Sequence, residues 1–178
     1  MKNYFALLFF LLTITAIGQE KYLTKKGTIN FEASVPSFEE VKAKNSTVTA
    51  ILNADKGEIA ALALMKGFRF KNALMEEHFN ENYVESDDHP KATFKGKLVG
   101  FDKNNVQSEY QIKGTLTLHG KSKDIDVKAS VNKNGDTYSL SSSFTAKPED
   151  FDISIPKIVS KKIAQDVVVS IDFDLIKK

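Results

Sequence analysis

The chain has 178 residues, a formal net charge of +2 and no cysteine, and Arg69 is its only arginine. A nearly neutral balance with so little arginine argues against a nucleic-acid-binding protein, which depends on a basic excess. Without cysteine the protein has no disulfides and no lipoprotein cysteine to carry a lipid. The length suits one domain that is stabilised by a hydrophobic core.

The N-terminus has the pattern of a secretory signal peptide. Lys2 precedes an apolar run over residues 4–12, and small residues follow up to Gly18. This order is typical of an export signal, and the apolar run is shorter than a membrane-spanning helix requires. We predict cleavage after Gly18, which makes residues 1–18 the signal peptide and exports residues 19–178. An uncleaved membrane anchor is the alternative.

Apolar and polar residues alternate along most of the remaining chain, as in strands that expose one face to water. The alternating segments are 28–35, 92–100, 110–118, 125–131, 138–144 and 167–175. Turn-forming residues occupy 53–57, 102–105, 119–122 and 132–136. Short strands separated by such turns predict one all-β domain, either an antiparallel barrel or a sandwich.

Two segments interrupt the alternation. Residues 73–86 are predicted to form a short helix, because Asn72 can cap it and Met75, Phe79 and Tyr83 form one apolar stripe. Residues 148–163 are apolar but have no clear period, and a long connection of this kind is expected to form a rim or lid.

The sequence offers weak candidates for metal binding or catalysis. Glu77, His78 and Glu81 share the predicted helix, but the His-Glu-x-x-His spacing is absent, and a solvated acidic helix explains them better. His89 lies beyond the helix. His119 stands beside a glycine, where a turn residue is the favoured interpretation. We therefore predict no metal, no cofactor and no enzymatic activity.

The predicted inner faces mix bulky and small residues. An eight-stranded barrel either fills with side chains or holds one small ligand, and the sequence leaves both outcomes open. The bulky residues at these positions include Phe31, Phe94, Phe144 and Phe173. The small residues include Ala33, Ala92, Gly96, Ala129 and Ser142.

Three ordered motifs resemble the YceI-like family. They are residues 74–79 followed by 89–94, the hairpin segment 112–123, and the segment 147–153. The resemblance covers nearly all of residues 19–178. It implies an exported, mainly antiparallel lipocalin-like barrel of about eight strands, with the 73–86 helix against its wall near one end. It also implies a lipid tail in the lumen. An exported protein without cysteine fits the periplasm or the outside of the cell, and the family favours the periplasm.

The chain departs from the family pattern at two places. Many members have an Arg-Asp-x-x-Leu stretch where this chain reads Phe70-Lys-Asn-Ala-Leu74, and their Tyr-Pro is replaced by His89-Pro90. The strand alternation predicts that Arg69, although nearby, points to the opposite face from its phenylalanine neighbours.

We predict a carrier or buffer that holds a long-chain isoprenoid, such as a polyprenyl or quinone-like lipid, in the barrel lumen. The predicted lumen residues are Phe31, Leu52, Leu64, Phe94, Leu98, Tyr110, Leu116, Tyr138, Phe144 and Phe173. In the predicted lid, Ile153, Ile155, Ile158 and Val159 gate the mouth, while Lys157, Lys161 and Lys162 meet a head group. The alternative is a structural or stress-response interaction module with a filled core and no ligand. The sequence leaves open whether the protein forms a homodimer.

Overall fold

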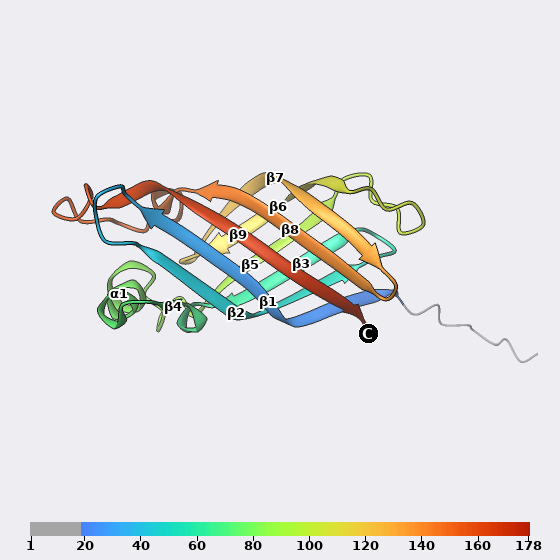
Figure 1. Ribbon diagram of the computed structural model, residues 1–178, viewed down its shortest axis with the longest axis horizontal. Helices are drawn as coiled ribbons and strands as arrows, with labels where there is room; N and C mark the ends of the chain where they lie inside the picture. Colours follow the sequence, from blue (N-terminus) through green and yellow to red (C-terminus); the bar gives the residue numbers. More distant parts are fainter. Residues whose placement is uncertain (1–18) are drawn as a thin grey trace, which may run out of the picture.

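Eight long strands close into an antiparallel barrel in the computed structural model, which describes residues 19–178 (Figure 1). The predicted signal peptide lies outside the described residues. Each long strand pairs with the next one along the chain, and β9 returns to pair with β1. The long strands are β1 (Lys21–Ser34), β2 (Lys42–Asn53), β3 (Glu58–Leu64), β5 (Lys91–Leu98), β6 (Glu109–Leu118), β7 (Lys121–Asn134), β8 (Thr137–Ala146) and β9 (Ile163–Lys177). The all-β prediction is confirmed, and of its two forms the barrel is the correct one.

One end of the barrel is filled by side chains. Tyr22 and Tyr138 meet edge to face with ring centroids 4.6 Å apart, and Phe101 packs on Tyr138 and Tyr110. Leu52, which pairs with Tyr22 across β1 and β2, is fully buried beside them. The C-terminus lies at this end, which we call the closed end (Figure 1).

A network of charged side chains links several segments of the chain at the outer surface of the closed end. Glu20 accepts the hydroxyl hydrogen of Tyr22 at 2.8 Å, and Lys103 donates to Glu20 at 2.9 Å and to Asp55 at 2.7 Å. Lys177, close to the C-terminus, lies 3.0 Å from Glu20. Hydrogen bonds lower the pKa of Glu20 to about 2; the bond from Lys103 has the largest effect, followed by those from Tyr22 and Lys177. Burial and the bond to Glu20 raise the pKa of Tyr22 well above its usual value.

The predicted helix is present at the opposite end and is shorter than expected. Helix α1 (Ala73–His78) is capped by Asn72, whose side-chain oxygen accepts from the Leu74 N–H at 2.9 Å. It continues as the π-helical turn η2 (Phe79–Tyr83). The helix ends there rather than at residue 86 because Glu85 adopts a left-handed φ of 45°. Among residues 19–178, no helix has the length and apolar character needed to cross a membrane.

Short elements complete this end. The 3-10 helix η1 (Met65–Gly67) and the two-residue strand β4 (Arg69–Phe70), which pairs with β2, connect β3 to α1. The 3-10 helix η3 (Pro148–Phe151) follows β8 and leads into an irregular segment that reaches β9. We call residues 152–162 the strap. The strap and α1 lie at the same end of the barrel (Figure 1).

Candidate functional site

The half of the barrel away from the closed end encloses a cavity of about 490 Å³. Its wall is almost entirely apolar, and Glu39, His78, Lys147 and Lys162 are the acidic, basic and histidine residues among those that line it. All four are exposed, as is Phe38, so the cavity reaches solvent where they stand. The lining residues on the eight long strands are Ile29, Phe31, Ala33, Ile59, Ala61, Ala63, Ala92, Phe94, Ile112, Leu116, Leu118, Ile125, Val127, Phe144, Ala146, Ile163, Val167, Val169, Ile171 and Phe173.

The floor of the cavity is formed by the ring of Phe173, which lies against Gly27 of β1. A Cβ atom at Gly27 would lie only 2.6 Å from Cδ1 of the Phe173 ring. The missing side chain therefore lets this ring lie directly on the backbone of the neighbouring strand β1. Phe173 is 3% exposed and belongs both to the cavity lining and to the packed core beneath it. It thus separates the hollow half from the closed end.

A pair of glycines keeps the Phe94 ring close to the wall. Gly96 on β5 and Gly114 on β6 are partners in the strand register. A Cβ atom at either position would lie 2.6 Å from Cζ of Phe94. The ring therefore covers the two glycines, and the alanines on β3 and β5 leave the space in front of it open. The hollow therefore exists because several residues that face it have small side chains or none.

Four phenylalanines form one side of the mouth. The Phe79 ring of η2 lies 5.1 Å from Phe70, 5.3 Å from Phe31 and 5.9 Å from Phe68, measured between centroids. Such tilted and edge-on pairs are favourable beyond the area they bury. Met75 and Tyr83 also line the cavity, so the predicted apolar stripe of the helix faces the lumen. The helix is a side wall of the mouth.

Arg69 points outward, as its strand position predicts, and contacts the start of this helix from outside the barrel. Its Nη1 atom donates to the Lys66 carbonyl at 2.8 Å and to Glu76 at 2.9 Å. The second carboxylate oxygen of Glu76 accepts the Phe70 N–H at 3.0 Å. Arg69 is exposed and does not line the cavity. It therefore orients the helix and makes no contact with the lumen.

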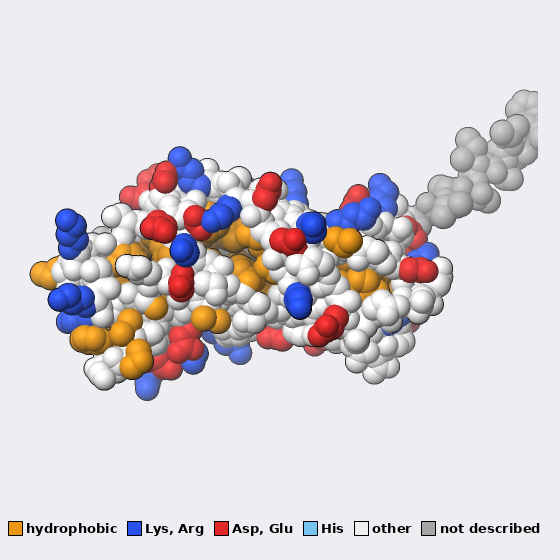
Figure 2. Space-filling view, turned by 90° about the horizontal axis from the view of Figure 1, so that it is seen from above, with side chains coloured by type: hydrophobic (Ala, Val, Ile, Leu, Met, Phe, Trp, Pro, Cys, Tyr) orange, Lys and Arg blue, Asp and Glu red, His pale blue; other side chains and the backbone are white. Residues whose placement is uncertain are grey.

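The strap covers the mouth from the side opposite the helix. Ile153, Ile155 and Val159 line the cavity, and Lys162 borders it. Lys157, Ile158 and Lys161 point to solvent, and Ile158 is 87% exposed. Figure 2 shows hydrophobic and lysine side chains side by side at this end of the molecule. The strap therefore contributes an apolar inner face and a basic outer face.

The structure brings together half of the residues that the sequence predicts for the lumen. Leu64 is 55% exposed on the outer face of β3, and four others are buried in the packed core beyond the cavity wall. Those that line the cavity are Phe31, Phe94, Leu116, Phe144 and Phe173; those in the packed core are Leu52, Leu98, Tyr110 and Tyr138.

Sequence reasoning missed the segment between β3 and α1. Met65, Phe68 and Phe70 all line the cavity, although the segment has only a short 3-10 helix and two strand residues. The apolar residues on both sides of Arg69 were the available signal, since a charged residue between two phenylalanines indicates one inward and one outward face.

The titratable groups gather at a different place from the one the sequence suggested. Within residues 19–178, Glu85, His89 and His119 are grouped closely enough to hold a metal ion, whereas Glu77, His78 and Glu81 are not. His119 occupies a hairpin turn, as predicted, with a φ of 49°.

The chain matches the family model described as YceI-like domain over residues 21–175. Similar solved structures include a polyisoprenoid-binding domain from Saccharophagus degradans, at 13% identity and a TM-score of 0.77, covering 90% of this chain and 100% of that one. BcnA from Burkholderia cenocepacia has 16% identity and a TM-score of 0.70, covering 84% and 96%. A YceI protein from Campylobacter jejuni has 19% identity and a TM-score of 0.64, covering 100% and 99%. No curated protein matches the chain.

Proposed function

The chain belongs to the YceI-like family, and from this membership and its cavity we propose that it reversibly binds a long-chain isoprenoid, a polyprenyl or quinone-like lipid, in the barrel. The observation that carries the proposal is a cavity of about 490 Å³ that is almost entirely apolar and reaches solvent beside exposed side chains. This volume is within the usual range for small-molecule sites. The proposed role is that of a carrier or buffer in the periplasm, or outside the cell, and it needs no catalytic step or cofactor.

The hydrophobic effect alone gives useful affinity at such a site. Each buried methylene-sized group contributes roughly 0.8 kcal/mol, so one five-carbon isoprene unit contributes on the order of 4 kcal/mol before ordering costs. Two or three units in the cavity therefore give about −8 kcal/mol after those costs, which corresponds to roughly micromolar affinity. No charged anchor is required for the tail.

We propose that the head group lies between the strap and the β8 end of the mouth. Lys162 and Lys147 border the cavity there, and Lys157 and Lys161 add positive charge on the outer face of the strap. A pyrophosphate would be attracted to this basic face, whereas an uncharged alcohol would not. Glu39 on the β1–β2 loop places negative charge on the lining as well, so the attraction is directed toward the strap.

The first test is direct extraction. The protein is purified from its source cells under mild conditions, extracted with organic solvent, and the extract is analysed by mass spectrometry. A near-stoichiometric isoprenoid supports the proposal. Repeatedly empty extracts, together with no binding of added polyprenols, would favour the structural or stress-response module instead.

The head-group proposal has its own matched pair of variants. Reversing Lys157, Lys161 and Lys162 to Glu should weaken binding of a polyprenyl pyrophosphate at least tenfold more than binding of the same polyprenol. The control reverses three exposed lysines that do not line the cavity, namely Lys25, Lys26 and Lys56, and so produces the same change in net charge. Equal losses for the pyrophosphate and the alcohol would exclude a role for these lysines in head-group binding.

A further inference from the structure

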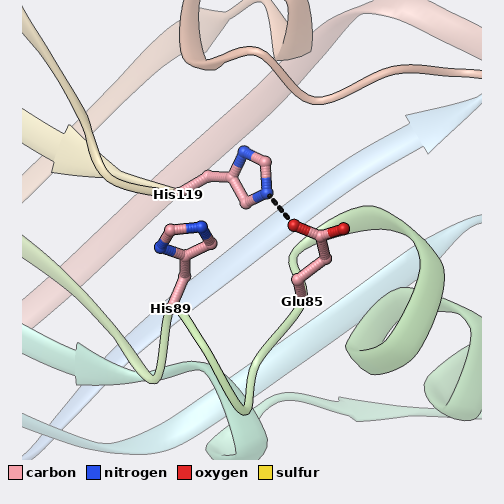
Figure 3. A group of neighbouring side chains, drawn as sticks. All are labelled: Glu85, His89 and His119. Carbon is pink, nitrogen blue, oxygen red and sulfur yellow. Dashed lines mark hydrogen bonds and ion pairs between the residues drawn. The ribbon is translucent and has the colours of Figure 1, made fainter.

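Glu85, His89 and His119 meet at the edge of the barrel (Figure 3). One ligand atom from each lies within 4.8 Å of the others. Nε2 of His119 is 3.0 Å from Oε2 of Glu85, and the rings of His89 and His119 are 4.4 Å apart at 68° to one another. We propose that these three side chains form a binding site for a divalent transition metal ion, best suited to Zn²⁺.

The hydrogen bonds of His119 carry the argument. The carbonyl oxygen of Phe151 can only accept, so Nδ1 of His119, 2.9 Å away, carries the hydrogen of that bond. In the neutral ring Nε2 then has a lone pair, which faces a carboxylate oxygen that also has only lone pairs to offer. Two acceptors repel at this distance unless a proton or a metal ion lies between them. Metal-binding histidines commonly donate their second nitrogen to a backbone carbonyl in this way.

The local backbone holds His89 beside this pair. The carbonyl of Glu85 accepts the N–H of His89 at 2.8 Å, which closes a tight turn and brings both side chains to the same place. The His89 ring rests on Gly120, where a Cβ atom would lie 3.1 Å from its Cε1. The hairpin that presents His119 therefore also supports His89. The site is built from two turns that are far apart in the sequence.

Two of the three residues have an uncommon backbone conformation. Glu85 has a φ of 45° and His119 a φ of 49°, both in the left-handed region, which residues other than Gly rarely adopt, although Asn, Asp and His do so more often than Glu. A two-residue hairpin turn with Gly120 at its second position normally takes Asn at its first. Their side chains meet each other in spite of this conformational penalty. Strained residues of this kind cluster at functional sites.

The ligand set indicates the class of metal. Two imidazoles and one carboxylate suit Zn²⁺ and related transition metals, whereas Ca²⁺ and Mg²⁺ require mostly oxygen ligands. Tetrahedral Zn²⁺ places its ligand atoms about 3.3 Å apart, so the present separations need only side-chain rotation. Three protein ligands leave a fourth position for water or an external ligand.

A bound ion would fasten the mouth of the barrel. Val84 next to Glu85 lines the cavity, and Phe151, which is 1% exposed, lines it from η3. The ion would join the turn after η2 to the β6–β7 hairpin, and the His119–Phe151 bond extends this link to η3. The proposal does not depend on the nature of the cavity's ligand.

The test is a calorimetric titration of the protein, without a polyhistidine tag, with ZnCl₂. We expect one site with roughly micromolar Kd, and Co²⁺ in place of Zn²⁺ should give visible absorption bands of a four-coordinate site. At Zn²⁺ a hundredfold above Kd, the unfolding midpoint should rise by roughly 5 to 10 °C. Binding at more than one equivalent with no such rise would contradict the proposal.

Matched variants separate this site from general metal affinity. His119→Asn retains a residue that suits the turn but removes the ligand, so it should fold and raise the Kd for Zn²⁺ at least tenfold. Glu85→Gln and His89→Asn should do the same. His78→Ala and Asp88→Asn remove a histidine and a carboxylate outside the cluster and should leave the Kd unchanged. Two results would overturn the proposal: the absence of saturable Zn²⁺ binding, or binding that survives His119→Asn and is lost in His78→Ala. The first result would mean that only a proton joins His119 to Glu85.

Discussion

Filling the cavity from its wall should weaken lipid binding and leave the barrel folded. Ala61 on β3 lines the cavity and pairs with Phe94 across the sheet. Ala60, the preceding residue, pairs with Lys95 and lies on the opposite face of the same strand. Ala61→Phe therefore puts an aromatic ring into the lumen, and Ala60→Phe puts the same ring outside the barrel. The two variants form a matched pair.

The magnitude follows from the space that the ring takes. A phenyl ring replaces about one five-carbon isoprene unit, whose burial is worth roughly 4 kcal/mol. Even if the lipid recovers half of this by shifting toward the mouth, about 2 kcal/mol is lost, which is roughly a 30-fold rise in Kd. The folded state should tolerate the change because the ring enters empty space instead of a packed core.

Binding is measured by titration with a dansyl-labelled farnesol, and stability by thermal unfolding. Ala61→Phe should raise the Kd about 30-fold and keep an unfolding midpoint close to that of the unmodified protein. Ala60→Phe should bind normally. Equal Kd values for the two variants, with both proteins folded, would refute the assignment of the lumen as the binding site.

Three further predictions concern stability. Gly114→Ala should lower the free energy of unfolding by about 2 kcal/mol, because its Cβ would lie 2.4 Å from the Lys95 carbonyl oxygen, which the strand pairing holds in place. Glu20→Gln should lower the unfolding midpoint at pH 7 by roughly 2 to 6 °C. Since the pKa of Glu20 is depressed to about 2, its charge stabilises the fold above about pH 4.5, and the difference should vanish as the pH falls toward 2. Tyr138→Phe should leave stability unchanged or raise it by about 1 kcal/mol, because the Tyr138 hydroxyl is buried without a hydrogen-bond partner among the described residues.

All three are measured by chemical or thermal unfolding, and the second is repeated across the pH range. Tyr22→Phe is the control for Tyr138→Phe, since the Tyr22 hydroxyl donates to Glu20 and its removal should destabilise the protein. A pH-independent effect of Glu20→Gln would contradict the ion-pair explanation. Wild-type-like stability of Gly114→Ala would show that β5 and β6 can move apart.

The face of each strand was predictable from the sequence, and the depth along the barrel was not. Alternation placed Phe31 and Phe144 inward, and both line the cavity. The same alternation placed Tyr110 and Tyr138 inward, but they lie at the closed end. The depth of a residue along the barrel depends on strand register and tilt, which cannot be read from the sequence of one strand. Every side chain in residues 60–64 is apolar, so no polar residue indicated which alternate positions face inward. Leu64 faces solvent.

The histidine cluster was unpredictable for a related reason. Glu85 and His119 are 34 residues apart, and no spacing rule joins a turn after a helix to the tip of a hairpin. The sequence did show the local part, since His119 beside Gly120 indicated a turn. The contact itself arises because β5 pairs with β6, which brings the β6–β7 hairpin next to the turn at residues 85–89 that precedes β5.

The two halves of the barrel divide stability and binding between them. An unfilled apolar space of about 490 Å³ forgoes packing worth on the order of 10 kcal/mol, by the cost of cavities in protein cores. Since small proteins have only about 5 to 15 kcal/mol of net stability, the rest of the fold has to compensate. The aromatic packing of Tyr22, Phe101 and Tyr138 and the charged network around Glu20 provide this at the closed end. A lipid tail in the cavity would restore part of the forgone packing, so occupancy of the open half should raise the stability of the whole barrel.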